Sequence, residues 1–174
     1  MRRGFTLIEL MISITILSIV MLFLYQSYSS LNKTNKLYDK ETNKIQTKQM
    51  RKKIMFLDFS LVLSKDITII NQNRKEDVVF LQSSHSMHDR YNPYIAYIVK
   101  DSKLYRLESL KKFKRYPLDA DIRFSLECFG EIESFRVYRS KKKNHKMFLL
   151  HVTFKDEEDI LLKINSDPNI LDKT

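Results

Sequence analysis

The N-terminal segment constrains this chain more than any other stretch. Residues 5–25 are apolar or small except for Glu9, which is the only charged residue between Arg3 and Lys33. A helix needs about 20 predominantly apolar residues to cross a bilayer, so the run predicts one membrane-spanning helix. A carboxylate within such a helix costs roughly 2.5 kcal/mol or more and normally has a specific partner. Glu9 is therefore the first candidate functional residue.

Cleaved export signals account poorly for this segment. A secretory signal has a short apolar stretch followed by a small-residue cleavage site, whereas TILSIVMLFLYQSYSS (residues 15–30) contains no convincing site of that kind. A twin-arginine signal would account for Arg2 and Arg3, but for neither Glu9 nor the length of the run. The apolar helix is therefore expected to remain in the mature protein.

A short motif surrounds the acidic residue. The stretch GFTLIEL (residues 4–10), behind a very short basic leader, resembles the processing motif of type IV pilins and type II secretion pseudopilins. In that family a prepilin peptidase cleaves after the glycine and methylates the new amino terminus. The resemblance implies cleavage between Gly4 and Phe5, N-methylation of Phe5, and removal of residues 1–4 as the leader.

Cleavage at this position would give Glu9 a partner. The new amine at Phe5 lies four residues before Glu9, so both groups sit on one helix face at similar membrane depth. When two such helices pack with an axial offset, the amine of one can meet the carboxylate of the next. Because an unpaired charge is costly at low dielectric, this pairing would favour entry into a filament and set its register. The resemblance implies this assembly role for Glu9 and Phe5.

The helix is expected to continue well beyond the membrane. The chain has no glycine or proline between Phe5 and Asn92, so nothing obvious ends the helix at the bilayer surface. We expect the membrane-spanning part at 5–25 and an amphipathic continuation over 26–66, ending near Ser64. At 1.5 Å per residue this helix would be about 90 Å long. One apolar stripe predicts its buried side, and it consists of Leu31, Leu37, Tyr38, Ile45, Met55, Phe56, Phe59 and Leu63.

A second apolar ridge lies roughly opposite the stripe near the end of the helix. It consists of Met50, Ile54, Leu57 and Leu61, spaced four, three and four residues apart. A helix that is apolar nearly all round is covered on both sides. One side would face the sheet, and the ridge could face either a local loop, which we favour, or a partner helix.

The rest of the chain reads as β-structure followed by a flexible tail. Residues 67–164 contain seven segments with strand length and composition, namely 78–82, 94–99, 103–108, 121–127, 134–139, 147–154 and 159–164. Asp101-Ser102 and Asp156-Glu157-Glu158 are turn signals, and the tail at 165–174 is expected to fray. The prediction is an α+β, pilin-like fold, in which a long N-terminal helix packs on an antiparallel sheet.

The remaining polar residues suggest no catalytic or metal site. Cys128 is expected to be a buried structural thiol, in phase with Ile122, Phe124 and Leu126. His85 and His88 lack the further ligands of a metal site, and the acidic turn at 156–158 lacks the spaced oxygen ligands of a calcium loop. The run Lys141 to Lys143 is expected to be an exposed loop. No triad, paired-carboxylate motif or phosphate loop points to an enzyme, and no cofactor is expected.

The resemblance also implies a function. The helix end IMFLDFSLVLSKD (54–66) and the strand pair YIAYIVKDSKLYRLES (94–109) resemble the minor pseudopilin lettered J. Such a subunit starts or tips a short pseudopilus that exports protein across the outer membrane. Its expected partners are other pseudopilins, prepilin peptidase and an inner-membrane assembly platform. It would cross the inner membrane once, with its leader in the cytoplasm and its C-terminal domain in the periplasm.

The net charge leaves one alternative open. The formal charge is +10, and such a charge can attract nucleic acid. A pilin-like component of a DNA-uptake system, or a minor type IV pilin, would have the same fold. A solvated basic surface is nevertheless the favoured interpretation of the charge.

Overall fold

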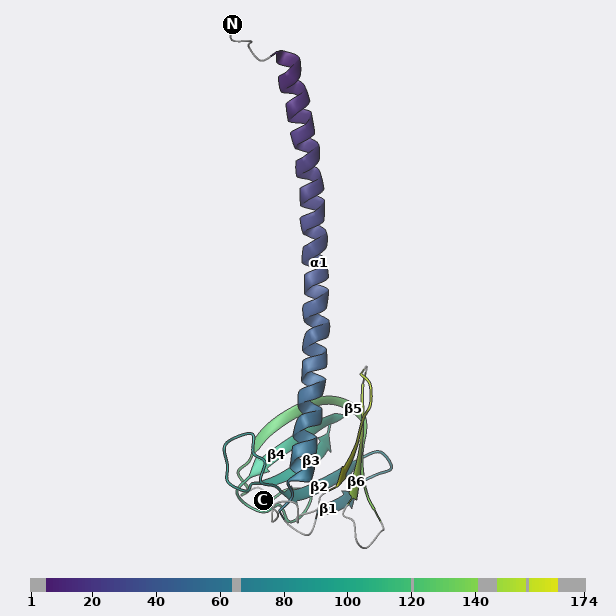
Figure 1. The fold of residues 1–174 in the computed structure, drawn as a ribbon. Helices are drawn as coiled ribbons and strands as arrows, with labels where there is room; N and C mark the ends of the chain where they lie inside the picture. The colour runs from purple at the N-terminus through teal and green to yellow at the C-terminus, as the bar shows by residue number, and fades with distance from the viewer. Residues whose placement is uncertain (1–5, 64–66, 120, 141–146, 156, 166–174) are drawn as a thin grey trace. The chain divides into compact units, whose positions relative to one another are not determined.

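In the described part of the chain, one helix is followed by one antiparallel sheet. The computed structural model describes residues 6–63, 67–119, 121–140, 147–155 and 157–165. Helix α1 covers Leu7–Ser60 (Figure 1). The chain divides into two compact units, residues 1–48 and 49–174. The first unit is helical throughout its described part, and the second contains the end of α1 together with the sheet.

The sheet is a seven-stranded meander. Its strands are β1 (Thr68–Asn71), β2 (Asp77–Gln82), β3 (Tyr94–Lys100), β4 (Lys103–Ser109), β5 (Ser125–Arg139), β6 (Met147–Phe154) and β7 (Ile160–Asn165). The spatial order follows the sequence order from β1 to β7. Each strand pairs with the next in antiparallel fashion.

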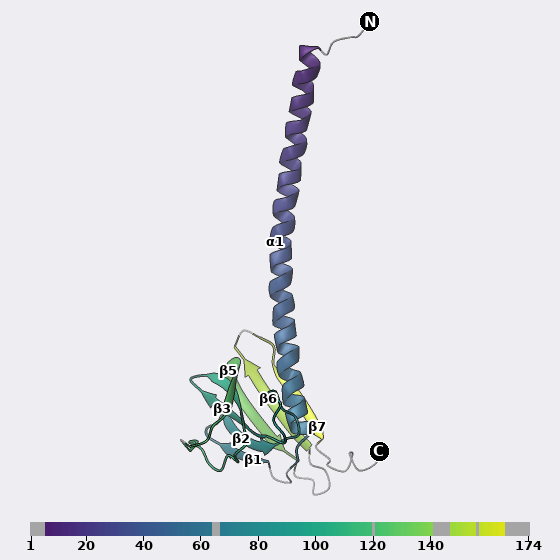
Figure 2. The same cartoon turned by 90° about the vertical axis from the view of Figure 1, so that its left-hand side faces the viewer.

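The long strand β5 makes the sheet curl. Its first half pairs with β4 and its second half with β6. Phe135 in the second half also forms a parallel bridge with Glu76, just before β2, and the Phe135 backbone N–H donates to the Lys75 carbonyl at 2.9 Å. The buried carboxylate of Asp77 accepts the backbone N–H of Val137 at 2.8 Å. These contacts bring β5 back towards β2, and the sheet curls round the last turns of α1 (Figure 2).

The main core fills the concave side of the curled sheet. Phe59 of α1 is fully buried. Its ring centroid lies 5.8 Å from that of Tyr97 on β3 and 6.2 Å from that of Phe148 on β6. Burying a side chain of this size stabilises the fold by roughly 1.5–3 kcal/mol. The expected α+β arrangement, a long N-terminal helix packed on an antiparallel sheet, is confirmed.

A smaller core lies on the convex side of the sheet. It is formed mainly by β2, β3 and β4 and is covered by the segment between β4 and β5. Phe113 of that segment stacks on Phe80 of β2, with ring centroids 5.8 Å apart. The sheet is therefore buried on both faces over β2 and β3, which explains why the strand segments at 78–82 and 94–99 are almost continuously apolar.

Five of the predicted strands are confirmed as separate strands, and the other two are parts of one longer strand. The structure adds β1, which the sequence analysis missed because a four-residue strand gives little periodic signal. The segments at 121–127 and 134–139 are not separate strands. Residues 122–124 lie outside any strand, and β5 runs continuously from Ser125 to Arg139. Gly130 is not a turn residue but lies within β5, beside a register shift opposite Leu104 and Tyr105.

The buried state predicted for Cys128 is wrong. Its side chain is exposed, as are Phe124 and Leu126, which share its alternation. The register shift opposes Tyr105 to Cys128 and Leu104 to Gly130, so Phe129 is the extra residue of a bulge and enters the main core. Phe124, Leu126 and Cys128 all precede the bulge and lie on one face of the segment, and this whole face is exposed. The bulge reverses the alternation only after Cys128.

The connections show a similar mixture of agreement and difference. Asp101 and Ser102 have φ values of 51° and 57°, which is typical of a two-residue hairpin turn between β3 and β4, as predicted. The helix ends at Ser60 rather than near Ser64, because Val62 already bridges to Ser83. The run Lys141 to Lys143, residue Asp156 of the acidic turn and residues 166–174 of the tail lie outside the described residues.

Replacing Gly130 should destabilise the sheet. Its φ of 114° disfavours any side chain, and an added Cβ would lie 3.0 Å from the Arg51 guanidinium. We expect Gly130→Ala to lower the free energy of unfolding by about 1–3 kcal/mol, measured by urea denaturation. The matched control is Cys128→Ala, an exposed change on the same strand that should cost less than about 0.5 kcal/mol. Equal effects of the two substitutions would contradict this account of the bulge.

Candidate functional site

The predicted assembly residue Glu9 caps the start of α1. The backbone N–H and the hydroxyl of Thr6 both donate to Glu9 Oε2 at 2.9 Å, and the Glu9 N–H lies 3.4 Å from the Thr6 hydroxyl oxygen. This reciprocal arrangement of a threonine and a glutamate three residues later is a capping box. The sequence analysis did not identify it, although Thr6-Leu7-Ile8-Glu9 carries its signature.

The capping box leaves part of the Glu9 carboxylate available. Both bonds from Thr6 use Oε2, and Oε1 accepts no hydrogen bond from any described residue. Glu9 can therefore cap its own helix and still accept a donor from a second chain. The predicted processing residues, Gly4 and Phe5, lie outside the described part of the chain.

The helix that follows is apolar and open to its surroundings. All residues from 7 to 25 are exposed, and this part of α1 is long and apolar enough to cross a membrane. An exposed apolar surface of this length is consistent with a helix surrounded by lipid. Ser13 and Ser18 donate their hydroxyls to backbone carbonyls one turn earlier, both at 2.8 Å, so these polar groups are satisfied within the helix.

At the other end of α1 the buried face is centred on a charged residue. Asp58 is fully buried. Its Oδ2 accepts the hydroxyl of Tyr97 at 2.6 Å and Nε of Arg106 at 2.7 Å. Its Oδ1 lies 3.1 Å from Arg106 Nη2 and 2.6 Å from Nδ1 of His85. This single carboxylate therefore ties α1 to β3, β4 and the loop after β2.

A second buried carboxylate extends the network along β4. Arg106 Nη1 donates to Glu108 Oε2 at 2.8 Å, and both side chains are fully buried. Burial raises the pKa of Glu108, but hydrogen bonds from the Ser86 hydroxyl, the Met87 N–H and Arg106 outweigh it and lower the pKa to about 2. Burial lowers the pKa of Arg106. The hydrogen bonds to Asp58 and the negative charge of Asp58 raise this pKa by more than burial lowers it. The charged forms of both residues are therefore favoured.

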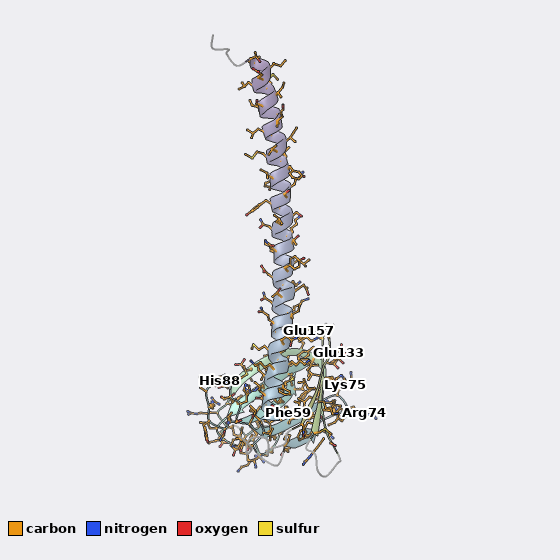
Figure 3. The ribbon with its side chains drawn as sticks, in the orientation of Figure 1. Phe59, Arg74, Lys75, His88, Glu133 and Glu157 are labelled. Atoms are coloured by element: carbon orange, nitrogen blue, oxygen red, sulfur yellow. The ribbon has the colours of Figure 1, made fainter. Side chains whose placement is uncertain are left out.

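The loop between β2 and β3 is held by these carboxylates. The Ser86 hydroxyl donates to Glu108 Oε1 at 2.6 Å, and the Met87 N–H donates to Oε2 at 3.0 Å. The Arg90 guanidinium donates to the Glu108 backbone carbonyl and to Ser125 Oγ. His88 lies 3.5 Å from Glu108 and 3.4 Å from Glu127, and Figure 3 places it on the side of the sheet away from Arg74 and Lys75. The loop is thus fixed to the buried network.

A separate clamp holds the helix to β6 and to the β6–β7 connection. Arg51 Nη1 lies 2.9 Å and 3.2 Å from the two carboxylate oxygens of Glu157. Its guanidinium also lies over the Phe154 ring, 4.9 Å from the centroid. Glu157, which belongs to the predicted hairpin tip, therefore holds this connection to the helix through Arg51.

The predicted stripe and ridge lie on either side of the true buried face. Of the ridge, Ile54 is buried in the main core, Leu57 and Leu61 are half-buried, and Met50 is 57% exposed. Of the stripe, Met55 and Phe59 are buried, whereas Phe56 is 46% exposed. The ridge as a surface for a partner helix stays a prediction. In the part of the chain that the structure describes, no group of three or more His, Cys, Asp or Glu side chains has an arrangement that could hold a metal ion.

The comparison with known families concerns the capped end of α1. Residues 1–25 match the prokaryotic N-terminal methylation motif. No curated protein and no solved structure matches the chain. The motif supports the type IV pilin and pseudopilin family, and it implies processing by prepilin peptidase and assembly with other pilins. It points to a structural subunit rather than an enzyme. Motif and helix together are consistent with a single-pass membrane anchor.

The buried network is the main feature that sequence reasoning missed. Two signals were present. Asp58 stands alone among apolar residues in IMFLDFSLVL, and Arg106 and Glu108 share the inward alternation of Leu104 in KLYRLE. Charges at core positions are rare unless they are paired. A carboxylate and an arginine–glutamate pair at such positions were therefore candidates for one shared buried site.

The Glu108 carboxylate should make the fold sensitive to acid. Its pKa is lowered from an ordinary value of 4.5 to about 2. The stabilisation is therefore complete above pH 4.5 and is lost as the pH falls towards 2. Between pH 6 and pH 3 the free energy of unfolding should fall by about 2 kcal/mol because of this group. Urea denaturation at the two pH values measures the fall. Glu108→Gln should remove this part of the pH dependence. If wild type and variant lose the same stability between these pH values, the assignment to Glu108 is wrong.

Proposed function

We propose that this chain is a minor pseudopilin, a structural subunit that helps to start or tip a short pseudopilus for protein export across the outer membrane. The observation that carries the proposal is the methylation motif on a long helix whose first turn holds a lone carboxylate, Glu9. An intramembrane carboxylate with one uncommitted oxygen suits a contact between subunits. The resemblance of residues 54–66 and 94–109 to the J-type pseudopilin supports the more specific assignment.

The proposed topology follows from the same features. Prepilin peptidase would remove residues 1–4 on the cytoplasmic side, residues 5–25 would remain in the inner membrane, and the sheet would lie in the periplasm. The buried network at Asp58 suits this role because it holds the helix firmly to the sheet. Forces applied through the helix during filament extension would then reach the whole soluble unit.

Gene deletion tests the export role. Loss of this chain should reduce protein release into the medium by more than tenfold, while the unreleased proteins accumulate in the periplasm. Complementation with the wild-type gene should restore release, and a gene lacking residues 1–4 should not. Unchanged release together with a loss of natural transformation would contradict export and favour uptake.

A second candidate function is DNA uptake by the same kind of filament. The observation that favours it is the formal charge of +10. Electrostatic binding of DNA by lysine and arginine weakens steeply as salt rises. Binding of duplex DNA by the full chain in detergent at 50 mM salt, lost at 300 mM, would support this candidate. Absence of binding at 50 mM salt would remove its basis.

A further inference from the structure

A row of lysines follows one face of α1 beyond the apolar segment. It consists of Lys33, Lys36, Lys40 and Lys44, spaced three, four and four residues apart. Residues at these spacings are neighbours on one helix face, and all four side chains are exposed. We call this set the lysine row. It extends over about 16 Å of helix.

The charges of the row are poorly compensated within the chain. Lys44 pairs with Glu41 at 3.4 Å, on the exposed helix surface. Among the described residues, Lys33, Lys36 and Lys40 form no ion pair, and Lys44 is the member of the row that does. Like charges three or four residues apart destabilise a helix. The row therefore weakens the isolated helix, and a partner that supplies negative charge would remove this cost.

The apolar residues of the same helix segment lie mainly on another side. Leu31, Tyr38 and Ile45 are exposed, and at 100° per residue they lie roughly opposite the lysine row. Leu37 is also exposed and lies nearer the row. The segment thus presents two different surfaces, one apolar and one basic. Two surfaces of different chemistry suit two different neighbours.

We propose that the lysine row is the docking surface for an acidic helix of a different filament subunit, one that carries aspartate or glutamate at the same three- and four-residue spacing. This inference rests on the proposed filament function and adds to it the chemistry of one neighbour. A second copy of this chain does not fit there, because any axial offset shorter than the row would oppose lysine to lysine. Charges on helix flanks select partners by such repulsion as well as by attraction.

Anionic lipid is the other source of negative charge, and the spacing along the helix disfavours it. Lys40 and Lys44 lie 15 and 19 residues beyond Tyr25, which corresponds to roughly 22 and 28 Å along the helix. The Debye length at physiological salt is about 8 Å. Only the start of the row lies near enough to a headgroup layer to interact with it strongly.

A charge-reversed copy of the chain can serve as the acidic partner. The variant Lys33→Glu, Lys36→Glu, Lys40→Glu, Lys44→Glu keeps the apolar surface and reverses only the row. Full-length chains, labelled at Thr47→Cys in a Cys128→Ala background, would be reconstituted in neutral phosphatidylcholine vesicles. Association is then measured by energy transfer for wild-type pairs, reversed pairs and mixed pairs.

Mixed pairs should associate about tenfold more strongly than either like pair at low salt, because several weak ion pairs add. The ratio of mixed-pair to like-pair association should approach one at 0.5 M NaCl, because salt screens the charges. The matched control reverses four exposed lysines of the sheet unit instead, namely Lys111, Lys112, Lys114 and Lys155. This control has the same net charge, and it should pair with the wild type no better than the wild type pairs with itself.

Two outcomes would overturn the inference. One is equal association of all pairs, or an equal gain with the control variant, which would show that net charge rather than the row decides. The other is loss of the mixed-pair preference when the vesicles contain phosphatidylglycerol, which would assign the row to lipid. The assay requires no cleavage and no filament. The two proposals can therefore fail separately. A processed N-terminus without mixed-pair association rejects the docking role of the lysine row but not the filament function. Mixed-pair association with an unprocessed N-terminus rejects the filament function but not the docking role.

Discussion

Asp58→Ala should lower the free energy of unfolding by about 3–5 kcal/mol, because it leaves the buried Arg106 without its main partner. The same substitution removes the acceptor of the Tyr97 hydroxyl and the contact with His85. Burial and the nearby Asp58 raise the pKa of Tyr97, so this hydroxyl stays a neutral donor that needs an acceptor. The chain has no tryptophan, so the measurement is urea denaturation of the full chain in detergent, followed by tyrosine near-ultraviolet circular dichroism.

Two further variants test whether the loss of stability comes from breaking the buried Asp58–Arg106 pair or from removing any carboxylate of the helix. Asp39→Ala removes an exposed carboxylate of the same helix and should cost less than about 0.5 kcal/mol. The double variant Asp58→Ala, Arg106→Ala should cost less than the sum of the two single variants, since each single variant already breaks the Asp58–Arg106 pair and leaves one of its two charges unpaired. Additive losses would contradict a network in which Arg106 depends on Asp58.

Replacing Glu9 should reduce incorporation into filaments by more than tenfold. Two roles of this carboxylate compete, because it caps its own helix through Thr6 and is also expected to pair with the amine of a neighbouring subunit. Glu9→Gln separates them, since glutamine can complete a capping box but carries no charge. We expect Glu9→Gln and Glu9→Ala to be equally defective, measured as the fraction of the chain in sheared filaments or in cross-linked complexes with other pilins.

Variants of the capping partner complete this test. Thr6→Ala removes both side-chain bonds of the cap but leaves the Glu9 charge, and an N-cap loss costs about 1 kcal/mol. Its assembly defect should therefore be several-fold at most. Ser13→Ala, which removes only a hydroxyl bonded to the Glu9 carbonyl, serves as the matched control. Normal assembly of Glu9→Gln together with failure of Thr6→Ala would assign Glu9 to capping and reject the ion pair.

The elements with long regular patterns were predictable. The unbroken run to Asn92 without glycine or proline predicts the long helix, and five strands have enough β-branched and aromatic residues to be recognised. The four-residue β1 and the bulge at Gly130 were not predictable in the same way. A short strand gives little signal, and a bulge reverses the alternation on which strand reading depends. The wrong prediction for Cys128 has another cause, because the face that it shares with Phe124 and Leu126 is exposed.

The candidate sites divide along a similar line. Glu9 is recognisable because a charge in an apolar run stands out, and its capping role was visible in Thr6-Leu7-Ile8-Glu9. The buried face of α1 was misjudged because a hydrophobic-pattern reading places charged residues outside. Asp58 and Arg51 occupy the middle of that face, and only their tertiary partners, Arg106 and Glu157, make this favourable. Contacts between residues about 50 to 100 positions apart cannot be read from local periodicity.

The N-terminus of the mature protein tests the central claim most directly. Mass spectrometry of the chain purified from its native membrane should show loss of residues 1–4 and an N-methylated Phe5 as the first residue. Gly4→Ala should block cleavage and leave the leader attached. An intact Met1 in the wild-type protein, or a cleavage site within or beyond the apolar run, would contradict the account of this chain as a processed pilin-like subunit.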